Sequence, residues 1–189
     1  MKLTMEAARS AVAANVKEDH LLRHALAVSA AMEAMAEHFG EDSAHWAAVG
    51  YAHDVDFELY PEEHCKHVRE LLTPYDIDEE DLRAIESHGF GSCSDVEPLS
   101  NMEKSLYTVD ELTGIISAAS LMRPTGISDL ALSSFKKKFK DKKFAAKCDR
   151  ALILNGCEML GMDSADVMQI CIDGMRRYAA ELGIEGSAQ

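Results

Sequence analysis

The amino-acid sequence predicts an all-α protein, folded as a single compact domain of about eight or nine helices. The chain has 189 residues, a length that suits one domain with one apolar core. Aromatic residues make up only 6% of it, whereas Ala, Leu and Met are abundant, and this balance favours helices over sheets. No segment shows the alternation of apolar and polar residues that is typical of a half-buried strand.

Five helices are expected in the N-terminal half of the chain. Asp19 can cap the second of them, and Gly40 ends it. Pro61 suits the first turn of the fourth helix, and Asp78 opens the fifth. The expected ranges are 3–17, 20–39, 43–53, 61–72 and 79–88.

Four more helices are expected in the C-terminal half. Ser100 and Glu103 have the spacing of a capping box at the start of a long apolar helix. Residues 123–126 (RPTG) break the chain after that helix, and Gly183 follows the last helix in a C-cap position. The expected ranges are 101–121, 129–139, 143–160 and 164–182.

The formal net charge of −14, from 33 acidic and 19 basic residues, argues against two classes of partner. Such a field repels nucleic acids and anionic membranes, so neither is expected to bind this protein. The N-terminal segment lacks the apolar core of a secretory signal, and no apolar run is long enough to span a bilayer. The five cysteines include no CxxC pair, and their odd number favours free thiols in a reducing cytoplasm. We therefore expect a cytoplasmic protein, and the sequence leaves a homo-oligomer open.

Several His and Asp residues occur in apolar helical surroundings, where they need partners. His53 and Asp54 end the apolar stretch WAAVGYAHDVD. His24 lies within LLRHALAV and Asp110 within SLYTVDELTGII. A buried ionised carboxylate is costly unless it is paired, and a divalent ion ligated by imidazoles and carboxylates would satisfy all four groups.

Simpler interpretations exist for each of these residues taken alone. A single inward-pointing His is more often a hydrogen-bonded core residue than a metal ligand, and an isolated Asp often pairs with a nearby Arg. His64 and His88 lie on the expected fourth and fifth helices, and His64 and His67 could simply be solvated. His38 and His45 flank the polar joint after the second helix and are expected at the surface. The joint occurrence of the set is what favours a metal site.

The order of His24, the His53-Asp54 pair and Asp110 resembles that of the HD superfamily of metal-dependent phosphohydrolases. The resemblance covers about residues 20–120, the expected metal-binding core, on which helices over 129–182 would pack. The stretches HDVDFELYPEEH, DELTGIISAASLMRP and SFKKKFKDKKFAA are also similar to a branch of small, functionally uncharacterised HD-domain hydrolases.

The resemblance implies a helical HD-type fold with one or two divalent transition-metal ions (Mn, Fe, Co, Ni or Zn). The first ion would be bound by His24, His53, Asp54 and Asp110, and the second by His64 and His88 with Asp54 as a bridge. The implied activity is hydrolysis of a phosphomonoester or phosphodiester by metal-activated water, with a small phosphorylated metabolite or nucleotide as substrate. Two alternatives remain, a di-iron HD-type oxygenase and a non-catalytic, metal-binding regulatory domain.

Two positions depart from well-understood members of the superfamily. The cyclic-dinucleotide phosphodiesterases carry a Lys shortly after the His-Asp pair, and this chain has the sequence VDFE there. Single-metal deoxynucleotidases have a Glu where this chain has Phe57. Asp54 and Asp56 are the candidate catalytic residues, with Asp56 supporting a ligand or transferring a proton. The alternative for Asp56 is a turn residue that caps local amides.

A phosphohydrolase also needs cations that bind its substrate. The candidate substrate-binding residues are Arg123, Lys137, Lys138 and Arg150. The two lysines belong to the cluster KKKFKDKK, over 136–143, which could gather phosphate or could be a solvated helix end anchored by neighbouring phenylalanines.

Overall fold

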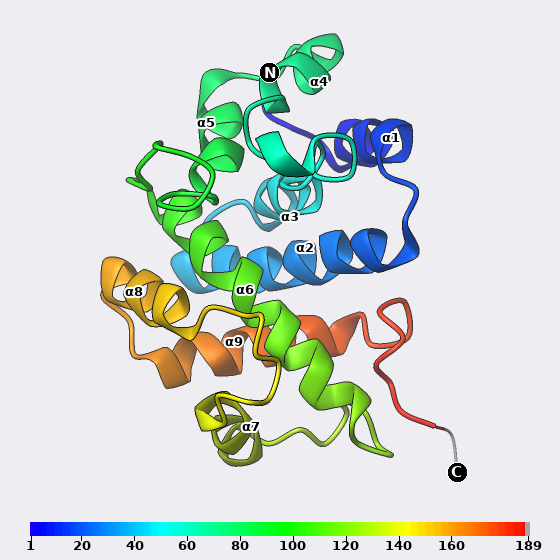
Figure 1. Cartoon of the computed structure of the whole chain (residues 1–189), viewed down its shortest axis with the longest axis vertical. Helices are drawn as coiled ribbons and strands as arrows, with labels where there is room; N and C mark the ends of the chain where they lie inside the picture. The colour runs from blue at the N-terminus through cyan, green and yellow to red at the C-terminus, as the bar shows by residue number, and fades with distance from the viewer. Residues whose placement is uncertain (188–189) are drawn as a thin grey trace.

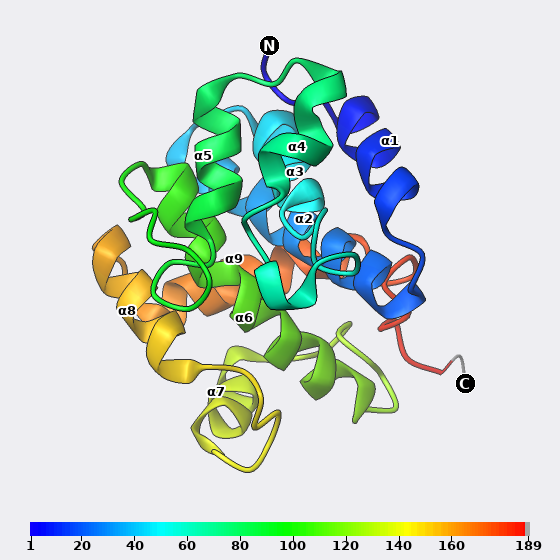
Figure 2. The same cartoon turned by 45° about the horizontal axis from the view of Figure 1, so that its top comes forward.

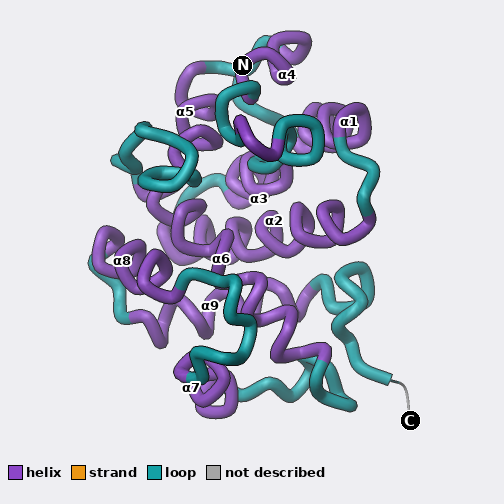
Figure 3. The backbone as a smooth tube through the Cα atoms, viewed as in Figure 1, coloured by secondary structure: helices purple, strands orange, loops and turns teal. Residues whose placement is uncertain are grey.

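Helices alone build the part of the chain that the structure, a computed structural model, describes, namely residues 1–187. Over this range the backbone has no strand, only an isolated bridge between Phe90 and Ser94 (Figure 3). The prediction of an all-α fold is therefore confirmed. The helices are α1 (Met5–Asn15), α2 (Asp19–Phe39), α3 (Ser43–Ala52), α4 (Val68–Leu72), α5 (Glu79–Ser87), α6 (Asn101–Leu121), α7 (Leu132–Lys140), α8 (Arg150–Leu160) and α9 (Ser164–Arg177), with 3-10 turns at Pro61–Glu63 and Thr73–Tyr75.

Helix α2 lies at the centre, and other helices pack on several of its sides (Figure 1). It contacts α3 and α9 most extensively, and the long helix α6 crosses it. Six of its buried residues are alanines, whose small side chains allow neighbouring helices to approach closely. Helix α3 is apolar on nearly all sides because it lies between α2, α1 and α5. The C-terminal helices α8 and α9 pack on α6 and α2, respectively.

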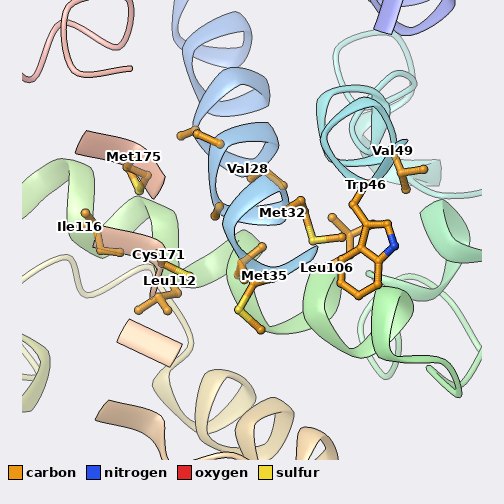
Figure 4. Packing of buried hydrophobic residues seen from close by; sticks show 14 of the residues in the cluster. Val28, Met32, Met35, Trp46, Val49, Leu106, Leu112, Ile116, Cys171 and Met175 are labelled. Carbon is orange, nitrogen blue, oxygen red and sulfur yellow. The ribbon is translucent and has the colours of Figure 1, made fainter. Parts of the chain in front are cut away.

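The apolar core is continuous across these interfaces (Figure 4). Val28 and Met35 of α2 are fully buried, and Trp46 of α3 lies beside them in the same cluster. Leu112 of α6 and Cys171 of α9 extend the cluster toward the C-terminal helices. None of the helices within residues 1–187 is long and apolar enough to cross a membrane.

The long helices begin and end where the sequence predicts them. Helix α6 has the predicted bounds, and Ser100 and Glu103 form the complete capping box at its start. Gly40 ends α2 in the left-handed conformation, with a φ of 71°. Asp19, however, is the first residue of α2 rather than its cap. The cap position is Glu18, and the carboxylate of Glu58 accepts the amide hydrogens that precede the helix.

The predicted helix over 61–72 is wrong, because the chain forms a short 3-10 turn, a bend and then α4. Cys65 has a φ of 69°, a conformation that interrupts a right-handed helix. The carboxylate of Asp56 accepts a hydrogen bond from the backbone N–H of His67 at 3.2 Å, which holds this bend. The bend turns His64 toward the end of α3, as described below.

Three C-terminal boundaries also differ from the prediction. The helix expected over 143–160 starts only at Arg150, because Asp149 caps it and turns precede it. The last helix ends at Arg177, and the chain continues in turns toward Gly183. Helix α7 begins at Leu132, three residues later than expected.

His45, expected at the surface, is buried and paired with the fully buried Asp81 of α5. Its Nε2 lies 2.7 Å from Asp81 Oδ1, while Asp81 Oδ2 accepts the backbone N–H of Leu3. The hydrogen bond to Asp81 raises the pKa of His45 above its usual value, and the charge of Asp42 adds to this effect. Burial and the charge of Lys2 lower the pKa but do not outweigh the rise. The pair joins the N-terminus, α3 and α5.

We expect the contribution of His45 to stability to depend on pH. The pKa of His45 is higher in the folded protein than the value of 6.5 expected in the unfolded chain. The stabilisation from the protonated imidazole is therefore complete below about pH 6.5 and is lost as the pH rises through the folded-state pKa. The free energy of unfolding lost in His45→Gln should therefore be larger at about pH 5.5 than at about pH 9. Urea titrations of both proteins with a chelator present would measure the difference. An equal loss at both pH values would contradict the pairing.

Gly174 allows α9 to lie directly against α2. A Cβ atom there would stand 2.6 Å from the carbonyl oxygen of Ala30 and 2.8 Å from the Cβ of Ala34. Because a backbone oxygen cannot move aside alone, Gly174→Ala should lower the free energy of unfolding by about 1–3 kcal/mol. Gly114→Ala in α6 is the matched control, since its Cβ would approach only the thiol of Cys148, at 3.0 Å. Similar losses in urea titrations of both variants would contradict the close packing.

Candidate metal centre

Six His and Asp side chains from separate parts of the chain meet where α2, α3, α5 and α6 converge. Figure 2 shows how the backbones of these four helices lie together. Four of them come from the two long helices and from the end of α3, and two come from the bend before α4 and the end of α5. They are His24, His53, Asp54, His64, His88 and Asp110. The structure thus brings together every residue that the sequence predicts as a metal ligand.

The first group of ligand atoms is formed by His24, His53, Asp54 and Asp110. Nε2 of His24 lies 2.9 Å from Asp110 Oδ1, 3.2 Å from Nε2 of His53 and 3.6 Å from Asp54 Oδ2. Nε2 of His53 lies 3.3 Å from Asp54 Oδ2 and 3.4 Å from Asp110 Oδ1. Ligands bound at roughly 2.0–2.2 Å to one ion are separated from one another by roughly 3.0–3.5 Å. The first group therefore has the spacing of a coordination shell.

The second group is formed by His64 and His88 around the other oxygen of Asp54. Asp54 Oδ1 lies 3.2 Å from Nε2 of His64 and 3.5 Å from Nε2 of His88. The two imidazole nitrogens are 3.0 Å apart. Because Oδ2 faces the first group and Oδ1 the second, Asp54 would be able to hold an ion on each side.

Each of three histidines is fixed through the ring nitrogen that points away from the cluster. Nδ1 of His53 donates to the carbonyl oxygen of Gly50 at 2.7 Å, and Nδ1 of His88 donates to that of Ile85 at 2.5 Å. Nδ1 of His64 donates to Asp56 Oδ1 at 2.8 Å. Since a carbonyl oxygen only accepts, these contacts hold the proton on Nδ1 and leave the lone pair of Nε2 for the cluster.

This arrangement brings several hydrogen-bond acceptors together with no hydrogen-bond donor between them. In the neutral rings, the Nε2 lone pairs of His64 and His88 face each other at 3.0 Å beside a carboxylate oxygen. Such a group of buried acceptors is stable only if it holds a proton or another cation. A divalent ion in each group would accept all of these lone pairs, so the residues present fit metal binding.

The directions of the pKa shifts in the cluster also indicate that these side chains favour a bound positive charge. Burial lowers the pKa of His53, but Asp54 and Asp110 outweigh it and raise the pKa well above its usual value. Burial also lowers the pKa of His64, yet hydrogen bonds to Asp54 and Asp56 raise it to about 10. Conversely, burial raises the pKa of Asp54 and Asp110, and the neighbouring imidazoles lower both below their usual range.

An open cavity of about 380 Å³ gives access to the cluster. Four of the cluster residues line it, together with the aromatic ring of Phe57, which packs edge-on against His64. Its remaining walls are Gly89, Ser92, Cys93, Glu111, Asp149 and Leu152. A larger cavity of about 470 Å³, between α1, α2 and the turns after α9, is lined by none of the six clustered residues. A third cavity of about 300 Å³ reaches only His24 of the cluster, so the cavity of about 380 Å³ is the one that exposes most of the clustered residues.

Two thiols beside the second group were not singled out from the sequence. The Sγ atoms of Cys65 and Cys93 lie 3.3 Å apart, and Cys65 Sγ lies 4.0 Å from both ring nitrogens of His88. All five cysteines are free. The only signal in the sequence is proximity, since Cys65 directly follows His64 and Cys93 lies on the loop after His88.

Asp56 is fully buried behind His64, away from the cavity wall. Its two oxygens accept hydrogen bonds from His64 Nδ1 and from the backbone N–H of His67. This position matches two of the roles expected for Asp56. One oxygen supports the candidate ligand His64, and the other caps the backbone amide of His67.

None of the four candidate substrate-binding residues lines the cavity. Arg123 donates to Asp129 on the loop after α6. Arg150 directs its guanidinium at five backbone carbonyls of residues 139–148, which fixes the segment before α8. Lys138 lies over the ring of Phe144, and Lys137 is exposed on α7, whose Phe135 and Phe139 are buried.

No family model, curated protein or solved structure matches this chain.

Proposed function

We propose that the protein is a metal-dependent phosphohydrolase of the HD type, acting on a small phosphate ester. The observation that carries this proposal is Asp54, whose two oxygens face two separate groups of imidazole nitrogens. The ordered ligand set also resembles that of the HD superfamily, as set out above. An open pair of adjacent cation sites suits phosphate esters, because both the attacking and the leaving oxygen need charge stabilisation.

Divalent ions bound there would supply Lewis acidity, which lowers the pKa of water and offsets negative charge on a phosphate. The residues of the chain would hold and orient these ions. His53 and His88 are fixed by backbone carbonyls and His64 by Asp56, so little reorganisation is needed on binding. The volume of about 380 Å³ suits a small molecule.

The test is hydrolysis by protein stripped with a chelator and reloaded with Mn²⁺, Co²⁺, Ni²⁺ or Zn²⁺. Phosphate release from small monoesters, or alcohol release from small diesters, should appear with at least one metal and be absent from the stripped protein. Elemental analysis should find two ions in each active chain. No turnover with any metal would contradict the proposal. Iron in anaerobically purified protein, with oxygen consumed on adding a substrate, would replace it with an oxygenase.

A further inference from the structure

The wall of the cavity beyond the metal ligands carries negative charge and no Lys or Arg. Its ionisable residues outside the six clustered ones are Glu111, Asp149 and Cys93. A phosphate bound at the cluster would direct the rest of its molecule toward this wall. The charge on that part of the ligand therefore decides how well it fits.

Of the two carboxylates in this wall, Glu111 has fewer partners that offset its negative charge. Asp149 caps α8, where its Oδ1 accepts the N–H groups of Ala151 and Leu152, and the helix N-terminus offsets its charge. Glu111 accepts one backbone N–H, that of Asp149, at 3.1 Å. Within residues 1–187 it forms no ion pair with a Lys or Arg.

In the part of the chain that the structure describes, no Lys or Arg lines the cavity or lies within ion-pair distance of Glu111, and the arginines considered as phosphate contacts are engaged elsewhere. The guanidinium of Arg150, next to Asp149 in the chain, is directed at backbone carbonyls. Arg123, just after the end of α6, pairs with Asp129. A ligand would have to bring its own positive charge to this wall.

We propose that this site takes a phosphorylated ligand that carries an ammonium group, and that Glu111 determines this preference by pairing with it. The inference rests on the proposed function and extends it to a substrate class, aminoalkyl phosphates. A ligand with a carboxylate or a second phosphate in the same position would be repelled by Glu111 and Asp149.

Three phosphonates of similar size test the charge preference without turnover, because their carbon–phosphorus bond resists hydrolysis. They are 3-aminopropylphosphonate, its neutral isostere 3-hydroxypropylphosphonate, and the anionic 3-phosphonopropionate. Calorimetric titration of the Mn²⁺-loaded full chain near neutral pH would measure each affinity. We expect the amine to bind roughly tenfold more tightly than the alcohol, and the carboxylate to bind more weakly than both.

Glu111→Gln should remove the difference between the amine and the alcohol while leaving the affinity for the alcohol nearly unchanged. Glu158→Gln is the matched control, because it removes the same charge from an exposed position on α8 outside the cavity. This control should keep the roughly tenfold preference for the amine. Circular dichroism would check that both variants remain folded.

Equal binding of the amine and the alcohol to the unmodified chain would overturn the inference. A preference that persists in Glu111→Gln would overturn the role of Glu111. Either result leaves the phosphohydrolase proposal standing, provided that the neutral phosphonate binds and phosphate esters are hydrolysed. Absence of binding by all three phosphonates, with any metal, would overturn the inference, and absence of hydrolysis separately contradicts the function.

Discussion

Asp54→Asn is expected to reduce the metal content from two ions per chain to at most one weakly held ion, and to reduce hydrolysis by roughly a thousandfold or more. The reason is that Asp54 alone contributes an oxygen to both groups of ligand atoms. An amide offers one neutral oxygen in place of two anionic ones, so it cannot bridge two cations. Elemental analysis of the metal-loaded variant and phosphate release at saturating metal would measure the two effects.

Single-site variants make this result specific. His24→Ala and His88→Ala each remove one ligand from one group and should each lose one ion, with the other retained. Asp166→Asn, an exposed change of the same kind on α9, should retain both ions. Asp54→Asn with both ions bound would contradict the bridge. Loss of one ion with the other held at unchanged affinity would assign Asp54 to a single site.

The helical fold could be predicted wherever the signals are local. Helix α6 has a capping box and a long apolar pattern, and both lie within the segment itself. The region 61–72 could not be predicted, because Asp56 and the left-handed backbone of Cys65 decide its path. His45 is a similar case, since its partner Asp81 is 36 residues away in the chain and the joint that precedes it, residues 41–43, is polar.

Four of the candidate metal ligands could be named from the sequence because they are polar residues in apolar surroundings, namely His24, His53, Asp54 and Asp110. The other two, His64 and His88, were indicated by the resemblance, and all six meet in the structure. The basic residues could not be assigned in the same way. A guanidinium can bind phosphate or backbone carbonyls equally well. In the folded chain, Arg150 donates to backbone carbonyls. Glu111 was overlooked for a different reason. An acidic residue beside an expected ligand gains meaning only when the cavity wall around it is known.

Asp56→Asn is expected to weaken binding of the second ion by roughly 10–100-fold and to leave the first ion nearly unaffected. Asp56 accepts hydrogen bonds with both oxygens, from His64 Nδ1 and from the N–H of His67. An amide can satisfy only one of these donors, and its NH₂ group must face the other. His64 then loses the partner that directs its Nε2 toward Asp54, whereas His53 keeps its own partner, the carbonyl oxygen of Gly50.

The same variant separates the two roles that the sequence suggests for Asp56. If it positions His64, calorimetry will show two unequal losses of metal affinity, and excess metal will restore most of the hydrolysis. If it transfers a proton, both affinities will stay unchanged and the loss of rate will persist at saturating metal. Burial of Asp56 behind the imidazole favours the first outcome, because a proton donor or acceptor must reach the substrate or its water. Equal weakening of both ions would instead indicate that the bend before α4 has lost its structure.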